Sequence, residues 1–385
     1  MATTDPDGKT DTFSTPSTSG TANAPLSTEA LWGRGSPCPY DIVIDVRSPG
    51  EYAEDHIPGA INLPVLNDAE RAEVGTIYNR VGAFAARKVG AALISTNIGQ
   101  HIREHFADKG REYRPLVYCW RGGHRSASLA IVLAHVGWRV TVLKGGYKTY
   151  RGHVRRELET LPLQFEYKLL AGATGTGKTR LLHALASRGA QVLDLEGLAH
   201  HRGSLLGRVG PQPSQKYFDS LQVAAFDRFT LSQPIWVEAE SNRIGDVFLP
   251  PALWTMLRAA EGFALQVPIE GRVQHLLADY AHLLADTDTL KSKLSQLTSW
   301  HGPSQIQAWH YQIDAGDWSA LVASLLAVHY DPAYAKSARR CYPNVTQCVT
   351  MPDASPAAID AAARGLLAGG AAKAGRGLAV EARDD

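Results

Sequence analysis

The sequence predicts two α/β domains, each with a parallel sheet, followed by a helical C-terminal part. The chain of 385 residues exceeds the usual size of one compact domain. Short apolar runs alternate with helical patterns along two successive stretches, and from Arg272 to about Val328 apolar residues recur at helical spacing. We therefore divide the chain into a disordered tail (1–27), the two α/β domains (28–158 and 159–270), a helical part (271–370) and a second tail (371–385).

The composition narrows the class of protein. The 39 Lys and Arg residues nearly balance the 38 Asp and Glu residues, so no overall charge indicates a nucleic-acid or membrane partner, and an RNA site must be a local patch. The cysteines at 38, 119, 341 and 348 form neither metal-ligand pairs nor a disulfide framework, so we predict no metal site built from them. The polar first residues resemble no secretory signal, and no stretch has the apolar length of a membrane span. We expect a soluble, cytoplasmic protein with no membrane partner.

Apolar runs in the sequence predict the strands of both sheets. In the first domain we predict strands at 41–45, 115–118 and 139–143, with a helix from Ser126 to His135 and a turn at Gly145-Gly146. A charged helix over 151–161 and a break at Pro162 mark the boundary between the domains. In the second domain we predict strands at 165–171, 191–194, 234–238 and 265–269.

A cysteine loop lies between a strand and a helix in the first domain. Residues 118–126 read Tyr-Cys-Trp-Arg-Gly-Gly-His-Arg-Ser. Loop amides and a helix N-terminus favour an anion, and Arg121 and Arg125 add positive charge. We therefore expect Cys119 to be largely deprotonated near neutral pH and to act as a nucleophile. The competing interpretation is a buried structural cysteine beside a turn, and His124 is better explained as a surface residue than as a base.

A phosphate-binding loop opens the second domain. Residues 172–179, Gly-Ala-Thr-Gly-Thr-Gly-Lys-Thr, fit the P-loop pattern between a strand and a helix. Lys178 would neutralise the outer phosphate, and the Thr179 hydroxyl can bind a magnesium ion. The predicted phosphate-binding residues are Gly172, Thr174, Gly175, Thr176, Gly177, Lys178 and Thr179.

Acidic residues at two later strand ends are candidate partners of this loop. They are Asp194, with Glu196 close by, and Glu238, with Glu240 close by. None of these residues is clearly the aspartate that binds the metal ion in nucleotide-driven motor proteins. The loop can therefore hold a diphosphate in a protein that is not such a motor. Each carboxylate is explained equally well as a solvated residue at the end of a strand.

Two upstream segments complete a familiar pattern. Asp45-Val46-Arg47 and residues 56–60, His-Ile-Pro-Gly-Ala, together with the cysteine loop, resemble the rhodanese superfamily over about 41–146. The resemblance implies a rhodanese-like domain in which these two segments are chiefly structural. Arg125 follows Cys119 by six positions, one more than in simple rhodaneses. That spacing also matches the Cys-x5-Arg loop of protein phosphatases, including rhodanese-like ones, so loop length does not separate phosphatase from chalcogen transfer.

A rhodanese-like domain directly followed by a P-loop domain resembles the tRNA 2-selenouridine synthase family. Over about 41–262 the resemblance includes Asp-Leu-Glu-Gly-Leu-Ala at 194–199, His-Arg-Gly-Ser at 201–204, Pro-Ser-Gln at 213–215, Val-Glu-Ala-Glu-Ser at 237–241 and Arg-Ile-Gly at 243–245. It implies a transferase acting on wobble 2-thiouridine of certain tRNAs. In that family a geranyl group from geranyl diphosphate first alkylates the sulfur, and selenium derived from selenophosphate then displaces the geranylated sulfur. Cys119 would carry the selenium.

The resemblance also implies partners and co-substrates. The partners are tRNA and a selenophosphate-supplying enzyme, the co-substrates are selenophosphate and geranyl diphosphate, and no tightly bound cofactor is expected. We expect the P-loop to take geranyl diphosphate, with magnesium at Thr179. For tRNA phosphates we expect contacts from Arg151, Arg155, Arg156, Arg202 and Arg208. Trp300, Trp309 and His310 either stack on a base or, as we favour for the tryptophans, pack helices.

Two alternatives stay open at this point. One is a sulfurtransferase or rhodanese-like phosphatase fused to a kinase-like P-loop domain. The other is a non-catalytic sensor that binds a nucleotide and signals through an oxidisable Cys119.

Overall fold

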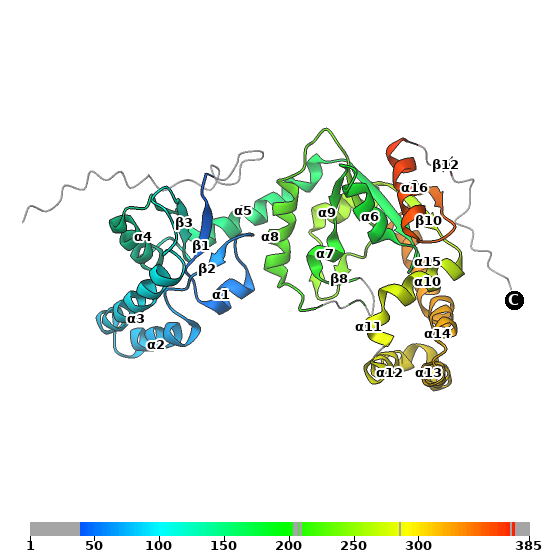
Figure 1. Ribbon diagram of the computed structural model, residues 1–385, viewed down its shortest axis with the longest axis horizontal. Coiled ribbons are helices and arrows are strands. Elements are labelled where there is room, and N and C mark those ends of the chain that lie inside the picture. Colours follow the sequence, from blue (N-terminus) through cyan, green and yellow to red (C-terminus); the bar gives the residue numbers. More distant parts are fainter. Residues whose placement is uncertain (1–38, 203–206, 208–209, 285, 370–371, 374–385) are drawn as a thin grey trace, which may run out of the picture. The chain divides into compact units, whose positions relative to one another are not determined.

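The structure is a computed structural model that describes residues 39–202, 207, 210–284, 286–369 and 372–373 (Figure 1). It divides into two compact units. The first runs to Tyr150 without the segment Ala53–Pro58, and the second contains that segment and the chain from Arg151 onward. The predicted tail 1–27 lies outside the described residues, as does most of the tail 371–385. The division between the units falls eight residues before the predicted boundary at 158, inside one continuous helix, α5 (Gly146–Thr160).

The first unit is built on a parallel sheet with the strand order β2-β1-β3-β4. Its strands are β1 (Ile42–Asp45), β2 (Ile61–Asn62), β3 (Pro115–Tyr118) and β4 (Thr141–Val142). The central strand β3 is buried at every position, as expected for an apolar run that helices cover on both faces. The three predicted strands are confirmed, the last over a shorter length.

Helices surround this sheet. They are α1 (Pro49–Glu54), α2 (Asp68–Arg80), α3 (Ala83–Glu104) and α4 (His124–Val136), in addition to α5. A capping box in which Asn67 and Glu70 bond each other's backbone amides starts α2. Leu129 and Leu133 of α4 pack on Ile44 and Val117 of the sheet. The predicted helix from Ser126 is confirmed and begins two residues earlier, at His124.

A buried ion pair fixes the strand end of β1. The Arg47 guanidinium donates to both Asp45 carboxylate oxygens, at 3.0 Å from Nε and 2.6 Å from Nη2. It also lies over the ring of Tyr147, 4.0 Å from its centroid. Both charged side chains are buried, and a buried pair of this kind requires such complete pairing. The finding agrees with the structural role that the resemblance implies for this segment.

The second unit is built on a sheet with the strand order β12-β11-β10-β5-β7-β6. Its strands are β5 (Tyr167–Gly172), β6 (Gln191–Leu193), β7 (Ile235–Glu238), β10 (Glu261–Gln266), β11 (Val345–Thr350) and β12 (Ala372–Lys373). All neighbours are parallel except β11 and β12, which are antiparallel. The strands predicted at 165–171, 191–194 and 234–238 are confirmed, whereas the one predicted at 265–269 is placed too late: β10 ends at Gln266, and Pro268 caps the helix that begins at Ile269.

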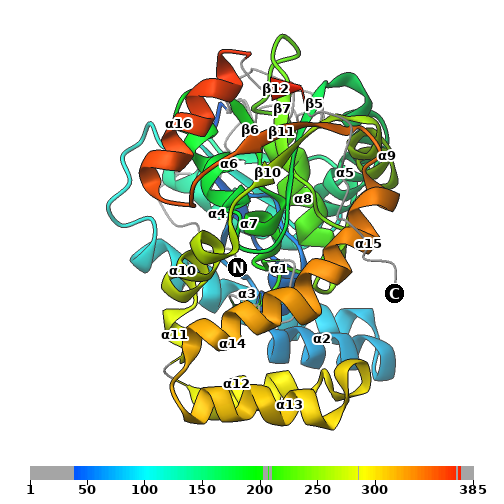
Figure 2. The same ribbon diagram turned by 90° about the vertical axis from the view of Figure 1, so that its right-hand side faces the viewer.

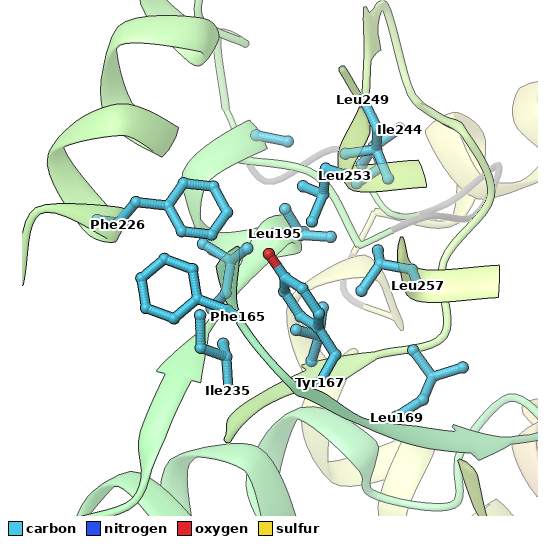
Figure 3. Close-up of a cluster of buried hydrophobic side chains, with 14 of the residues drawn as sticks. Phe165, Tyr167, Leu169, Leu195, Phe226, Ile235, Ile244, Leu249, Leu253 and Leu257 are labelled. Atoms are coloured by element: carbon cyan, nitrogen blue, oxygen red, sulfur yellow. The ribbon is translucent and has the colours of Figure 1, made fainter. Parts of the chain in front are cut away.

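Side chains alternate between the two faces of this sheet. On one face Tyr167, Leu169 and Ile235 join a cluster with Phe165 and Phe226, which the helices α8 (Gln215–Phe226) and α9 (Pro251–Ala259) cover (Figure 3). On the other face Leu170 and Trp236 pack under α6 (Lys178–Ala186) and α16 (Pro356–Leu367). Because successive side chains of a strand point to opposite faces, this alternation determines which residues at the strand ends can contribute to a site there.

Helices dominate the next part of the second unit. They are α10 (Ile269–Asp279), α11 (Ala281–Leu284), α12 (Thr287–Ser295), α13 (Thr298–Asp314), α14 (Trp318–Leu325), the π-helix η3 (Leu326–Tyr330) and α15 (Asp331–Cys341) (Figure 2). Leu290, Leu294, Trp309, Leu321 and Leu325 form a core of their own. The helical pattern predicted from Arg272 to Val328 is confirmed. Among the described residues no helix combines the length and apolarity of a membrane span.

The range 271–370, predicted to be a helical part, differs from the expectation at its end. The segment 345–350 returns to the sheet as β11 and pairs with β10, and α16 then packs against α6. The run Val-Thr-Gln-Cys-Val-Thr is rich in β-branched residues and covers an otherwise open sheet edge. The chain therefore inserts its helical part between two neighbouring strands of the P-loop sheet.

Candidate active sites

The sulfur of Cys119 lies at the N-terminus of α4, directly after β3. Its Sγ accepts a hydrogen bond from the backbone N–H of Gly123 at 3.2 Å and lies 3.2 Å from the Ser126 hydroxyl. The side chain is only 3% exposed. The structure thus provides the amide donor and helix N-terminus on which the predicted nucleophile depends, whereas the ionisation of the thiol stays a prediction.

Glycines and the start of α5 hold the cysteine loop in shape. Gly122 has a φ of +68°, and a Cβ there would lie 2.8 Å from the Leu143 carbonyl oxygen. The backbone N–H groups of Tyr147 and Lys148 donate to the carbonyls of Cys119 and Trp120, at 2.8 and 2.9 Å. The close backbone approach explains why glycine occupies position 122.

The two loop arginines have different surroundings. Arg125 donates from Nη1 to the Glu51 carboxylate at 2.7 Å, and Arg71 approaches the same carboxylate at 3.1 Å. Burial raises the pKa of Glu51, but the hydrogen bond and charge of Arg125 outweigh it, so this pKa lies below its ordinary value. Arg121 is exposed and makes no hydrogen bond or ion pair among the described residues. Arg125 is therefore already paired with an acid, whereas Arg121 is not, and the anion-binding role of both arginines stays a prediction.

The predicted phosphate loop follows β5 and leads into α6. Gly175 and Gly177 have φ values of +83° and +81°, which glycine adopts without strain. The Lys178 ammonium donates to the Gly172 carbonyl at 2.9 Å. Six of the seven predicted residues line one cavity of about 1030 Å³, the P-loop cavity: Gly172, Thr174, Gly175, Gly177, Lys178 and Thr179. Thr176 is the exception, because its side chain is 2% exposed and its hydroxyl donates to the Ala173 carbonyl.

Three glutamates meet beside Thr179. Glu196 comes from the helix α7 (Leu195–Ala199), Glu238 ends β7, and Glu240 follows two residues later; one carboxylate oxygen from each lies within 4.8 Å of the others. The Thr179 hydroxyl donates to Glu238 at 3.1 Å and approaches Glu196 at 3.4 Å. Sequence reasoning named both Glu196 and Glu240 only as neighbours of other candidates. The structure brings members of both predicted acidic pairs into one cluster.

Burial and mutual repulsion disfavour the charged forms of these three carboxylates. Burial, and then the charge of Glu238, raises the pKa of Glu196 to about 10. Burial, and then the charge of Glu240, raises the pKa of Glu238 to about 8. Burial also raises the pKa of Glu240. Glu238 Oε1 is buried without a hydrogen-bond partner.

These oxygens fit a magnesium ion. A hard divalent cation prefers carboxylate and hydroxyl oxygens, and it would satisfy the orphaned Glu238 oxygen and offset the repulsion between the carboxylates. Thr179 and the glutamates at 196, 238 and 240 would hold it. When bound there, the ion would neutralise part of the charge of a phosphate in the loop.

Asp194, the other predicted acidic partner, has a different role. Its carboxylate accepts the backbone N–H of Gly197 at 2.7 Å and caps α7, and it lies 2.8 Å from the His183 imidazole. Asp194 still lines the P-loop cavity but is not one of the clustered carboxylates.

An arginine that sequence reasoning missed supports the phosphate loop. Arg272, in the first turns of α10, donates from Nε to the Thr174 carbonyl at 2.8 Å. Its two other nitrogens donate to the Asp331 carboxylate of α15, at 3.0 and 2.6 Å. Since these partners are 98 and 59 positions away in sequence, no local pattern could have indicated the contact.

The residues expected to contact tRNA divide into several groups. Arg151 is paired with Asp219, and Arg202 lies 3.8 Å from Asp279 and over the Tyr280 ring. Arg155 and Arg156 are exposed, as expected of phosphate contacts. Arg208 lies outside the described residues, as do Gly203 and Ser204 of the quoted motif.

The three residues expected either to stack on a base or to pack helices also differ in their surroundings. Trp309 is fully buried and donates to Ser324, which confirms for this residue the interpretation that it packs helices. Trp300 is 73% exposed and lines the P-loop cavity. His310 lies 3.2 Å from the Lys291 carbonyl. Of these three candidates, Trp300 is the most exposed, so its ring is the one accessible for stacking on a base.

Fold and sites together define a protein with a rhodanese-like domain and a P-loop domain in one chain. Residues 28–153 match the model of the rhodanese-like domain, and residues 165–307 match that of the tRNA 2-selenouridine synthase AAA domain. The chain belongs to the tRNA 2-selenouridine synthase family. The predicted fold class is thereby confirmed.

Individual relatives bear the same name. The tRNA 2-selenouridine synthase of Alcanivorax borkumensis is 32% identical over 327 residues, which cover 76% of this chain and 88% of that protein. The enzyme of Nitrosomonas europaea is 37% identical over 243 residues, covering 62% of this chain and 63% of its own, so the chain spans slightly less than two thirds of that relative. A crystal structure of the N-terminal domain of a putative ATP/GTP binding protein from Clostridium difficile is 38% identical and covers 34% of this chain and 98% of its own, with a TM-score of 0.30.

Proposed function

We propose that this protein converts wobble 2-thiouridine of tRNA to 2-selenouridine through a geranylated intermediate. Geranyl diphosphate and selenophosphate are the co-substrates, and a selenophosphate-supplying enzyme is the second partner besides tRNA. The observation that carries the proposal is the presence, in one chain of this family, of a cysteine sulfur 3.2 Å from a helix N-terminal amide and a P-loop with carboxylates beside it.

The P-loop cavity serves the first step. The thiocarbonyl sulfur of the nucleoside forms a bond to C1 of the geranyl group, the C1–O bond breaks, and diphosphate leaves with its electron pair. Lys178 and the helix N-terminus of α6 stabilise the negative charge that develops on the leaving group. A magnesium ion at Thr179 and the three glutamates would add to this stabilisation.

The cysteine loop serves the second step. A selenium nucleophile adds to C2 of the base, and the geranylated sulfur leaves with the electrons of the C–S bond. Because alkylation makes this sulfur a better leaving group, two moderate steps replace one difficult step. The Cys119 thiolate forms an S–P bond to the phosphoryl group of selenophosphate as the P–Se bond breaks, which releases selenium at the selenide level as the nucleophile for C2; water then cleaves the S–P bond and phosphate leaves. Arg121, which is exposed and has no ion-pair partner among the described residues, offers a positive charge to the oxyanion of selenophosphate.

The test is direct. The full chain is incubated with 2-thiouridine tRNA, geranyl diphosphate, selenophosphate and magnesium, and the digested nucleosides are analysed by mass spectrometry. Geranylated and then selenated uridine are expected. If neither product forms while a control synthase is active, the proposal is wrong; Cys119-dependent hydrolysis of a phosphopeptide would instead support the phosphatase, and absence of any turnover the sensor.

A further inference from the structure

A small apolar cavity adjoins the P-loop cavity. It has a volume of about 60 Å³ and is lined mainly by leucine and valine side chains, among them Leu276, Leu277, Leu290, Val322 and Leu325. We call it the apolar cavity. Apart from Thr174 of the phosphate loop, its lining comes from α10 and its C-cap Tyr280, α11, α12, α14 and η3, so the helical part inserted between β10 and β11 supplies nearly all of it.

The two cavities share part of their walls. Thr174 of the phosphate loop lines both, as do Leu276, Tyr280 and Tyr330. Leu276 packs directly on the loop, because its Cδ1 atom lies 2.9 Å from the place where a Cβ of Gly175 would be. A ligand whose phosphates lie in the loop therefore has the entrance of the apolar cavity immediately beside it.

The surrounding packing holds this entrance in place. Arg272 bonds both the Thr174 carbonyl and the Asp331 carboxylate, and thereby connects α10, the phosphate loop and α15. Leu277 and Val322 remain only partly buried although α10 and α14 pack together, since both side chains border the apolar cavity. Such apolar surface, left uncovered beside an anion site, is unfavourable unless a ligand covers it.

The chemistry of the wall selects the kind of ligand. The base and ribose of a nucleotide need polar partners when they are buried, and here the hydroxyls of Thr174, Tyr280 and Tyr330 are the only polar side-chain groups in the wall as far as the structure describes it. A hydrocarbon chain needs none. We propose that the apolar cavity binds the hydrocarbon chain of a diphosphate ester whose diphosphate lies in the P-loop. This inference rests on the proposed function for the ester itself, and it adds the residues that recognise the chain.

The size of the cavity sets a limit on chain length. At about 15 Å³ for each water molecule, 60 Å³ holds about four of them, or about one isoprene unit, so the rest of a geranyl chain must lie along the wall that the two cavities share. Each buried methylene contributes roughly fourfold in affinity. Affinity should therefore rise from inorganic diphosphate through dimethylallyl to geranyl diphosphate and gain nothing further with farnesyl diphosphate.

The experiment is titration calorimetry of the full chain with these four compounds, and with a nucleoside triphosphate for comparison, in the presence of magnesium. Val322→Phe fills the cavity and should weaken geranyl diphosphate binding about tenfold or more while leaving inorganic diphosphate unchanged. Val328→Phe is the matched control, because Val328 is exposed on η3 and does not line the cavity; both ligands should bind as in the wild type. Leu277→Ala enlarges the cavity and should shift the preference toward farnesyl diphosphate.

The outcomes separate the inference from the proposed function. If geranyl diphosphate binds more tightly than inorganic diphosphate but neither Val322→Phe nor Leu277→Ala changes it, the chain lies elsewhere and the inference is wrong, while the proposed function stands. If geranyl diphosphate binds no better than inorganic diphosphate and a nucleoside triphosphate binds better than both, the ester is not the ligand and both fail. Unchanged inorganic diphosphate binding shows that a variant is folded.

Discussion

The Arg125 guanidinium lies 2.7 Å from the Glu51 carboxylate, so the second arginine of the cysteine loop is oriented by an acid on α1. Both side chains are mostly buried, and Arg125 therefore depends on Glu51 for charge compensation, whereas Glu51 is also approached by Arg71. This pairing leaves Arg121 as the loop arginine without a partner in the described part of the chain.

Replacing this acid tests the pairing. Glu51→Gln should destabilise the first unit by about 1–2 kcal/mol near neutral pH, because Arg125 loses a charged acceptor. The folded-state pKa of Glu51 lies below the ordinary 4.5, so its contribution is present above pH 4.5 and is lost as the pH falls through the folded value. Thermal unfolding measured from pH 7 to pH 3 should show the wild type losing its advantage over Glu51→Gln. An equal loss for Glu73→Gln, an exposed acid on α2, would contradict this account.

Magnesium binding should depend on the glutamate cluster. Glu238→Gln removes the carboxylate that accepts the Thr179 hydrogen bond and carries the orphaned oxygen, so magnesium affinity in the presence of inorganic diphosphate should fall about tenfold or more. Titration calorimetry measures it, and Glu270→Gln, an exposed acid on α10, serves as the control. Unaltered magnesium affinity in Glu238→Gln would remove the cluster from the site.

Arg272 should act as a positioning residue. Arg272→Ala leaves Thr174 without its donor and Asp331 without its partner, which should cost about 2–3 kcal/mol of stability and weaken inorganic diphosphate binding. Arg272→Lys should restore stability in part but not the binding, because one ammonium cannot serve both acceptors with the geometry of a guanidinium. Calorimetric unfolding and diphosphate titration check the two effects. Equal diphosphate affinity in all three proteins would show that the contact does not position the loop.

Local patterns predicted the elements that carry the chemistry. The strand before each loop, the glycines within it and the helix after it are adjacent in sequence, so the positions of Cys119 and Lys178 followed from the chain itself. The Thr176 side chain bonds the Ala173 carbonyl and so holds the loop in shape, while the predicted phosphate contact of this residue through its backbone stays a prediction.

Long-range relationships could not be predicted in this way. The meeting of Glu196 with Glu238 and Glu240 depends on the order of β5, β6 and β7 in the sheet. The return of β11 to β10 and the contact of Arg272 with Thr174 join segments about which local spacing carries no information. The apolar cavity needs side chains from several helices and was invisible for the same reason.

The central claim is that two separate sites carry out two successive steps, and nucleoside analysis of two variants tests it most directly. With 2-thiouridine tRNA, geranyl diphosphate and selenophosphate, Cys119→Ala should accumulate geranylated 2-thiouridine without 2-selenouridine, whereas Lys178→Ala should lose most of the geranylated product. Full formation of 2-selenouridine by Cys119→Ala would contradict the account.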